Sequence, residues 1–273
     1  MLCDARAQGG RSTSVSPETV LRVHNLVFGY TEKNTLEGVD IDAKKGEFVA
    51  LVGPNGSGKT TMMRCINKIL RQREGTVEIT GKDTKGLTLD EISRLCTTVP
   101  ATTPLGFSLS TKEFVTLGRS PYAKTWMWES DEDVEIVEKA MWDFGILHFS
   151  ERRLDELSSG ERARALLAKG VVQQPKLMMV DEPSAHLDIK YKIQVMQMLK
   201  SLAENGITVL MASHDINLVT AYCDKVLLLH GGRIVDYGTP AEVVTEESMK
   251  KVFDIDVRII RESGVPYILP SVT

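Results

Sequence analysis

The chain has 273 residues, of which 42% are hydrophobic and 26% are charged, and its formal net charge is −4. This length suits one large α/β domain or two small ones, and the composition is that of an ordinary soluble globular protein. Because the net charge is slightly negative, the chain has no overall positive potential that would attract nucleic acid, and we expect no nucleic-acid partner.

Membrane and redox signals point to the cytoplasm. The longest apolar runs are far too short to span a bilayer, and the N-terminus carries no signal-peptide pattern. Cys3, Cys65, Cys96 and Cys223 include no C-x-x-C pair, so neither a zinc site nor a disulfide framework is indicated. We expect reduced thiols in a cytoplasmic protein, which could act at a membrane only by docking onto another subunit.

The first predicted elements follow a polar stretch. Residues 1–16 include Gly, Ser, Gln and Arg and carry no strand or helix pattern, and we expect them to form a disordered tail. Apolar residues from Val20 to Phe28 predict a short strand. Phe48–Val52 is a continuous apolar run, typical of a strand buried on both faces. Thr60–Leu70 then carries apolar residues at helical spacing. The order is therefore strand, glycine-rich turn, helix.

The second half of the chain continues this alternation. Buried strands are predicted at Lys176–Val180 and Ile207–Ala212, and helices at Ala163–Val172 and Lys190–Leu202. Alternating strands and helices imply a mainly parallel sheet covered on both faces. Between the halves, the chain from about Ala101 to Leu157 is dominated by helix-like stretches with no clear strand, which predicts a helical insertion.

Two local signals stand near the end of the chain. Gly231-Gly232 lies between Val226–Leu229 and Arg233–Val235, which indicates a β-hairpin. Thr239 then begins a capping box, with Pro240 at the first helical position. A further helix is therefore expected directly after the hairpin.

A phosphate-binding pattern lies between the strand at 48–52 and the helix that follows it. Its glycines let backbone N–H groups turn toward phosphate oxygens, and the helix N-terminus adds positive charge. Lys59 can reach the β- and γ-phosphates, and the Thr60 hydroxyl is the expected magnesium ligand. The alternative, a glycine-rich turn that matches by chance, is disfavoured by the strand and helix on either side. The pattern G-x-x-x-x-G-K-[ST] is filled by Gly53, Pro54, Asn55, Gly56, Ser57, Gly58, Lys59 and Thr60.

A pair of carboxylates follows the apolar run Leu177–Val180. Asp181 and Glu182 would stand at the carboxyl end of a buried strand, where ligands bind in open α/β sheets. We expect Asp181 to hold magnesium through water, and Glu182 to orient and deprotonate an attacking water. On these residues alone, a strand that ends in a solvated acidic turn remains an equal alternative.

Together with three further stretches, these motifs resemble those of ABC ATPases in type and order. Leu157–Glu161 is similar to the signature usually written LSGGQ, and residues 184–188 resemble the D-loop. Ser213–Asp215 resembles the segment that holds the switch histidine, His214. Tyr30 lies where the family places an aromatic ring that stacks on adenine. The resemblance runs from about Val20 to about Val257.

The resemblance implies an α/β fold with a P-loop NTPase core and a mainly parallel sheet, an N-terminal antiparallel β subdomain and a helical insertion. It places a tail at 1–16, an ABC ATPase domain at 17–257 and a C-terminal extension at 258–273. Within the domain, the core comprises 17–100 and 168–240, and the helical subdomain comprises 101–167.

The resemblance also assigns roles to residues, with ATP and Mg²⁺ as cofactors. Glu182 and His214 are implied to be catalytic, and Thr60 and Asp181 to bind the metal. Nucleotide contacts are implied for Tyr30, for the phosphate loop and for Thr61. In the family, the signature binds the γ-phosphate held by the other subunit's P-loop. The signature residues expected to do so are Ser158, Gly160 and Glu161.

The expected partners follow from this arrangement. The chain holds one P-loop and one signature, so it should work as a pair, and a homodimer is expected. The family also implies a polytopic membrane permease and, indirectly, a substrate-binding protein. The chain would then be peripheral on the cytoplasmic face of the cell membrane.

Softer similarities suggest a branch of the family, the importers of iron–siderophore complexes, haem and cobalamin. They lie in the stretches 117–122, 187–189, 215–224 and 237–244. The ATPase of a metal-ion importer or an exporter is the first alternative. A soluble ABC protein of translation, DNA repair or iron–sulfur assembly is the second. Translation-type members usually carry two cores and repair-type members long coiled coils, and this sequence shows neither.

Two departures from the family pattern affect the expected rate. Ala101 follows Val99-Pro100 where the family usually has Gln, and no glutamine lies between Arg73 and Gln173. The signature ends in Glu161 where Gln is usual, and Ser159 replaces a glycine. Both changes lie near the expected γ-phosphate position, so we expect an active but slow ATPase.

Overall fold

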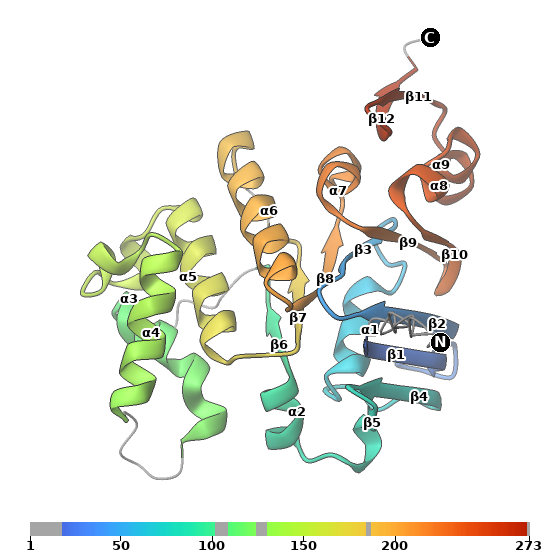
Figure 1. The fold of residues 1–273 in the computed structure, drawn as a ribbon. Helices are drawn as coiled ribbons and strands as arrows, with labels where there is room; N and C mark the ends of the chain where they lie inside the picture. Colours follow the sequence, from blue (N-terminus) through green and yellow to red (C-terminus); the bar gives the residue numbers. More distant parts are fainter. Residues whose placement is uncertain (1–17, 102–108, 124–129, 184–186, 272–273) are drawn as a thin grey trace, which may run out of the picture.

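The structure is a computed structural model that describes residues 18–101, 109–123, 130–183 and 187–271 (Figure 1). The predicted tail at 1–16 lies outside these ranges. Among the helices of the described part, none has both the length and the apolar character needed to cross a bilayer.

The central sheet has six strands in the order β10-β9-β3-β8-β7-β6. The strands β9, β3, β8, β7 and β6 run parallel, and β10 pairs antiparallel with β9 at one edge. The predicted mainly parallel sheet is therefore confirmed. Its strands are β3 (Phe48–Val52), β6 (Cys96–Val99), β7 (Leu177–Asp181), β8 (Thr208–Ser213), β9 (Lys225–His230) and β10 (Arg233–Gly238).

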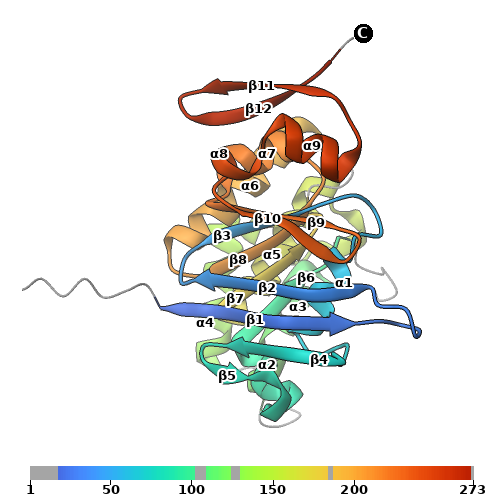
Figure 2. The same cartoon turned by 90° about the vertical axis from the view of Figure 1, so that its right-hand side faces the viewer.

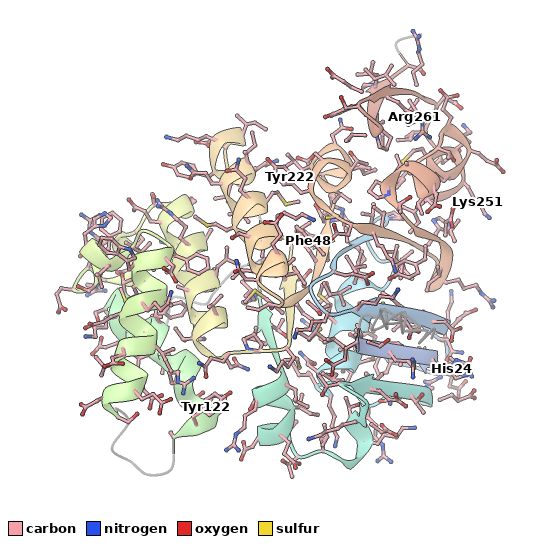
Figure 3. All side chains as sticks on the ribbon, viewed as in Figure 1. His24, Phe48, Tyr122, Tyr222, Lys251 and Arg261 are labelled. Atoms are coloured by element: carbon pink, nitrogen blue, oxygen red, sulfur yellow. The ribbon has the colours of Figure 1, made fainter. Side chains whose placement is uncertain are left out.

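Both faces of this sheet are buried, as the apolar run of β3 requires. Phe48, Ala50 and Val52 point into a core shared with the helices that follow in the sequence. Figure 3 labels Phe48 in this layer, near the middle of the molecule. Val49 and Leu51 point to the opposite face, into a second core. The strand is thus held between two apolar layers, and its end is fixed in space.

The second core joins the central sheet to an antiparallel one. Four strands in the order β2-β1-β4-β5 form this sheet, which confirms the antiparallel N-terminal part. Helix α1 (Lys59–Ile66) lies between the two sheets (Figure 1) and contributes Met62, Cys65 and Ile66 to the core. It ends four residues before the predicted Leu70. The strands are β1 (Thr19–Phe28), β2 (Leu36–Lys44), β4 (Glu74–Ile79) and β5 (Lys82–Asp83).

Helices α3 (Thr111–Thr116), α4 (Asp131–Asp143) and α5 (Ser159–Val172) pack together on one side of the molecule (Figure 1). The predicted helical insertion is confirmed. Helix α5 begins four residues before the predicted Ala163, because Ser158 caps its first turn. The expected boundary at residue 167 falls inside α5, and the division into subdomains stays a prediction. Two short elements lie between β5 and β6 in the sequence, η1 (Thr84–Gly86) and α2 (Leu89–Leu95). Three more lie between α3 and α5, namely η2 (Leu117–Tyr122), η3 (Leu147–Phe149) and η4 (Leu154–Glu156).

The chain ends in a small β-hairpin that the sequence pattern did not predict. Figure 2 shows it at the opposite end of the molecule from β5. Asn217 holds the hairpin on α7 by donating to the carbonyl of Ile268 at 3.2 Å and accepting from its N–H at 2.8 Å. The elements are α6 (Ile189–Glu204), α7 (Ile216–Tyr222), α8 (Pro240–Val243), α9 (Glu246–Phe253), β11 (Val257–Glu262) and β12 (Val265–Pro270).

Candidate functional site

The predicted phosphate loop connects β3 to the first turn of α1. Gly56 and Gly58 have φ values of 78° and 110°, a backbone region that side chains with a Cβ rarely adopt. Gly58 is also the N-cap of α1, and no side chain occupies that cap. The N–H groups of the first helical turn are therefore open toward the loop, as an anion site needs.

The loop is packed so closely that its sequence is constrained. A Cβ on Gly53 would lie 2.1 Å from the carbonyl oxygen of Leu229 and 2.9 Å from the Ser57 hydroxyl. That hydroxyl is buried and has no hydrogen-bond partner in the described part of the chain. A buried polar atom without a partner is costly, so this position fits a site that a phosphate group completes.

Lys59 is almost fully buried, and its ammonium group folds back onto the loop. Its Nζ donates to the carbonyl of Gly53 at 2.8 Å and to that of Pro54 at 3.1 Å. Burial lowers the pKa of Lys59, although the nearby carboxylates of Glu182 and Asp181 oppose this effect. The cation is thus held beside two carboxylates and under the phosphate loop.

The two predicted metal ligands lie in direct contact. The Thr60 hydroxyl donates to Oδ2 of Asp181 at 2.9 Å, which joins the start of α1 to the end of β7. A hydroxyl and a carboxylate are hard oxygen donors, and Mg²⁺ usually takes few protein ligands and completes its shell with water and phosphate oxygens. The donor set therefore fits Mg²⁺ bound together with a triphosphate.

Glu182 and His214, the predicted catalytic pair, are also brought together. Nε2 of His214 lies 2.5 Å from Oε1 of Glu182, although the two residues follow different strands, β7 and β8. Glu182 has a φ of 48°, which turns the chain sharply after Asp181, and its N–H donates to the carbonyl of Ala212 at 3.0 Å. A non-glycine residue in this conformation is strained, and such strain gathers at functional sites.

The predicted signature lies at the N-terminus of α5, within the helical insertion. Ser158 and Glu161 form a capping box: the N–H of Ser158 donates to the Glu161 carboxylate at 2.8 Å, and the N–H of Glu161 donates to the Ser158 hydroxyl at 3.3 Å. The backbone hydrogen bond from Ser158 is the main cause of a lowered pKa at Glu161. Glutamine could form the same box, so Glu161 keeps the local structure and changes only the charge.

Gly160 is required by a close contact at the same helix start. A Cβ at this position would lie 2.4 Å from Cδ1 of the Tyr191 ring, on α6. The signature is thus pressed against the helix that follows the predicted D-loop. Of that loop, Asp188 caps α6 by accepting from the N–H of Tyr191 at 3.2 Å. Residues 184–186 of the predicted D-loop lie outside the described residues.

Tyr30 stands beside the phosphate loop, on the connection between β1 and β2. Its side chain is 60% exposed, and its hydroxyl lies 3.4 Å from that of Thr61. Phe28 meets the ring edge-on, with centroids 4.9 Å apart. The ring is therefore held in place from one side and open to a ligand.

Two further residues bear on the site, Ala101, which the sequence analysis singled out, and Arg73, which it did not. Ala101 is exposed, and its neighbours Thr102 and Thr103 lie outside the described residues. Arg73 was not singled out, yet its guanidinium contacts the loop that carries Tyr30. No sequence signal marks such a contact, because Arg73 lies 44 positions from Gly29 and belongs to no motif.

The parallel sheet, the glycine loop that opens α1 and the carboxylates at the end of β7 define a P-loop nucleoside triphosphatase. A family model described as "ABC transporter" matches residues 36–185, which cover the phosphate loop, the signature and the end of β7. The chain belongs to the ABC transporter family, and it binds and hydrolyses ATP.

Similar proteins span most of the chain. The petrobactin import ATP-binding protein FpuC of Bacillus anthracis is 33% identical over 254 residues, which are 92% of this chain and 93% of that protein. The hemin import ATP-binding protein HmuV of Rhodococcus jostii is 33% identical, with coverages of 93% and 87%. An ABC transporter assigned to the metal-chelate type, solved in an inward-facing conformation, has a TM-score of 0.82 at 25% identity, with coverages of 93% and 98%.

Proposed function

We propose that this chain is the ATP-hydrolysing subunit of an importer for iron–siderophore, haem or cobalamin-type chelates, and that it works as a pair on a membrane permease. The observation that carries the proposal is the contact between Glu182 and His214 beside the phosphate loop, because a carboxylate held there can act as a general base toward water. Relatives named for petrobactin, hemin and cobalamin import support the class of cargo.

In this proposal each side chain of the site has one task. Lys59 leaves the loop carbonyls and pairs with the β- and γ-phosphates, and Tyr30 stacks on adenine. Thr60 and Asp181 hold Mg²⁺, which neutralises phosphate charge as a Lewis acid when it is bound. Glu182 accepts the proton of the attacking water, and His214 keeps the Glu182 carboxylate in position through their 2.5 Å contact.

The signature on α5 is proposed to act on the partner subunit's nucleotide. Ser158, Gly160 and Glu161 stand at a capped helix N-terminus, where backbone N–H groups favour an anion. Two bound ATP molecules would then hold two copies together, and hydrolysis would release them. Opening and closing of this pair would move the permease.

Co-purification tests the proposed role in transport. A tagged chain expressed in its own host should be recovered with the membranes, at their cytoplasmic face, together with a polytopic permease. High-salt washing of membranes that lack every permease should remove it. Persistent membrane association without any permease would contradict docking. Recovery only with ribosomes, DNA or iron–sulfur assembly proteins would contradict the transport role.

Ala101→Gln is expected to raise permease-stimulated ATP turnover several-fold, or to lower the Mg²⁺ concentration needed for half-maximal rate. An alanine methyl group can neither coordinate a metal nor hydrogen-bond a water, whereas an amide oxygen can do both. The measurement is the ATPase rate against Mg²⁺ concentration with the permease present. Ala241→Gln, an exposed alanine on α8, is the control. Coinciding curves for the native chain and Ala101→Gln would show that the missing glutamine is compensated elsewhere.

A further inference from the structure

Arg73 stands where the chain enters β4, away from every motif of the family. Its backbone N–H donates to the carbonyl of Val27 at 2.8 Å, which fixes the residue beside the last residues of β1. From there the side chain reaches the connection between β1 and β2. The contact therefore joins strand β4 to the segment that carries Tyr30.

This connection is a closed loop of residues 29–34. The N–H of Thr35 donates to the carbonyl of Phe28 at 2.7 Å and closes its neck. The loop is tight, because a Cβ on Gly29 would lie 2.3 Å from the carbonyl oxygen of Lys33. The segment holds none of the regular helix or strand hydrogen bonds, so its shape depends on other contacts.

The guanidinium of Arg73 supplies these contacts. Nη1 donates to the carbonyl of Glu32 at 3.0 Å and to Oδ1 of Asn34 at 2.9 Å. Nη2 donates to the carbonyl of Gly29 at 3.3 Å and also to that of Thr31. Four acceptors of one short loop thus converge on a single cation.

The convergence of oxygens explains why a cation is needed there. Three carbonyl dipoles that point at one spot repel one another, and a guanidinium offsets this repulsion with fixed, forked donors. Without it the loop would keep fewer restraints: the neck hydrogen bond, the edge contact between Tyr30 and Phe28, and the 3.4 Å contact between the hydroxyls of Tyr30 and Thr61. The Tyr30 ring would then be held less firmly in its position.

We infer that Arg73 is a positioning residue for nucleotide binding, which preorganises the loop of residues 29–34 so that Tyr30 presents its ring to adenine. The inference rests on the proposed role of Tyr30. It predicts that Arg73 affects recognition of the base and leaves recognition of the phosphates intact, since the phosphate loop makes no contact with Arg73 among the contacts described here.

The test compares two probes by calorimetric titration of the full chain. Arg73→Gln is expected to raise the Kd for Mg-ATP roughly tenfold, the scale of one lost base–aromatic stack. The Kd for inorganic tripolyphosphate with Mg²⁺, which has no base, should stay within twofold of native. Arg73→Lys keeps the charge without the fork and should give an intermediate Kd for Mg-ATP. Arg71→Gln, an exposed arginine nearby, is the matched control.

A double-mutant cycle identifies the pathway of the effect. If Arg73 acts through Tyr30, adding Arg73→Gln to Tyr30→Ala should raise the Kd for Mg-ATP no further than Tyr30→Ala alone. Additive effects would overturn the inference, as would an equal loss of tripolyphosphate binding or an unchanged Kd for Mg-ATP in Arg73→Gln. Retained tripolyphosphate binding also shows that the variant is folded.

The outcomes separate this inference from the proposed function. If Tyr30→Ala binds Mg-ATP as tightly as the native chain, Arg73 does not act on nucleotide binding through that ring. The proposed roles of the residues that hydrolyse ATP are unaffected by this result. If the native chain binds neither Mg-ATP nor tripolyphosphate, the proposed function itself fails.

Discussion

Glu182→Gln is expected to lower ATP turnover by a factor on the order of 10²–10⁴ and to leave ATP binding close to native. An amide has nearly the same shape as the carboxylate, so the loop after β7 and the contact with His214 can persist. It cannot accept a proton from the attacking water at neutral pH. The measurement is the steady-state ATPase rate with the permease present, alongside the Kd for ATP.

The same variant should accumulate as an ATP-bound dimer, because the nucleotide that joins the two subunits is no longer hydrolysed. Size-exclusion chromatography with and without ATP measures this. Glu247→Gln, an exposed glutamate on α9, makes the same chemical change away from the site and should behave as native. A near-native rate in Glu182→Gln would remove Glu182 from the role of general base.

Strands with uninterrupted apolar runs could be predicted from the sequence, and strands with mixed composition could not. β3, β7 and β8 are buried on both faces, so every residue of the run is apolar or nearly so. β6 reads Cys-Thr-Thr-Val, which fits a loop as well as a strand, and only pairing with β7 decides it. In the final hairpin, β11 mixes charged and apolar residues without regular alternation and β12 contains two prolines, so the pattern was ambiguous.

In the candidate site, too, some features could be predicted from the sequence and others could not. The phosphate loop is local in sequence, so its residues and its position before α1 follow from a short pattern. Contacts between distant segments need the fold. Thr60 and Asp181 meet across 121 positions, and only the parallel order of β3, β8 and β7 brings their ends to one edge of the sheet. Three of the four oxygens that Arg73 contacts are backbone carbonyls, which every residue has, so no sequence pattern marks this contact.

In the signature, helix capping explains why Glu161 can replace the usual glutamine. Glu161 differs from the usual glutamine, yet either residue completes a capping box with Ser158. The helix start is therefore preserved, and what changes is a negative charge beside the proposed γ-phosphate position. Ala101 has no such compensation among the contacts described here, so it remains the departure with the larger expected effect on rate.

Lys59→Ala is expected to weaken binding of both Mg-ATP and tripolyphosphate by roughly 10- to 100-fold, the scale of lost hydrogen bonds to a charged group. The ammonium group already lies under the phosphate loop, held by the carbonyls of Gly53 and Pro54. Its removal takes away the cation that phosphates would meet there. It also leaves Asp181 and Glu182 facing the incoming polyanion without the nearby positive charge that offsets them.

Lys59→Ala and Arg73→Gln are expected to differ in their effects on Mg-ATP and tripolyphosphate binding. Lys59→Ala should affect both probes equally, whereas Arg73→Gln should affect Mg-ATP alone, because one residue meets phosphates and the other holds the loop of Tyr30. Lys251→Ala removes an exposed lysine on the outer side of α9 (Figure 3) and serves as the charge-matched control. If Lys59→Ala binds tripolyphosphate as tightly as the native chain, then the ammonium group stays on the loop carbonyls in the bound state. Lys59 would in that case stabilise the loop and not contact the phosphates.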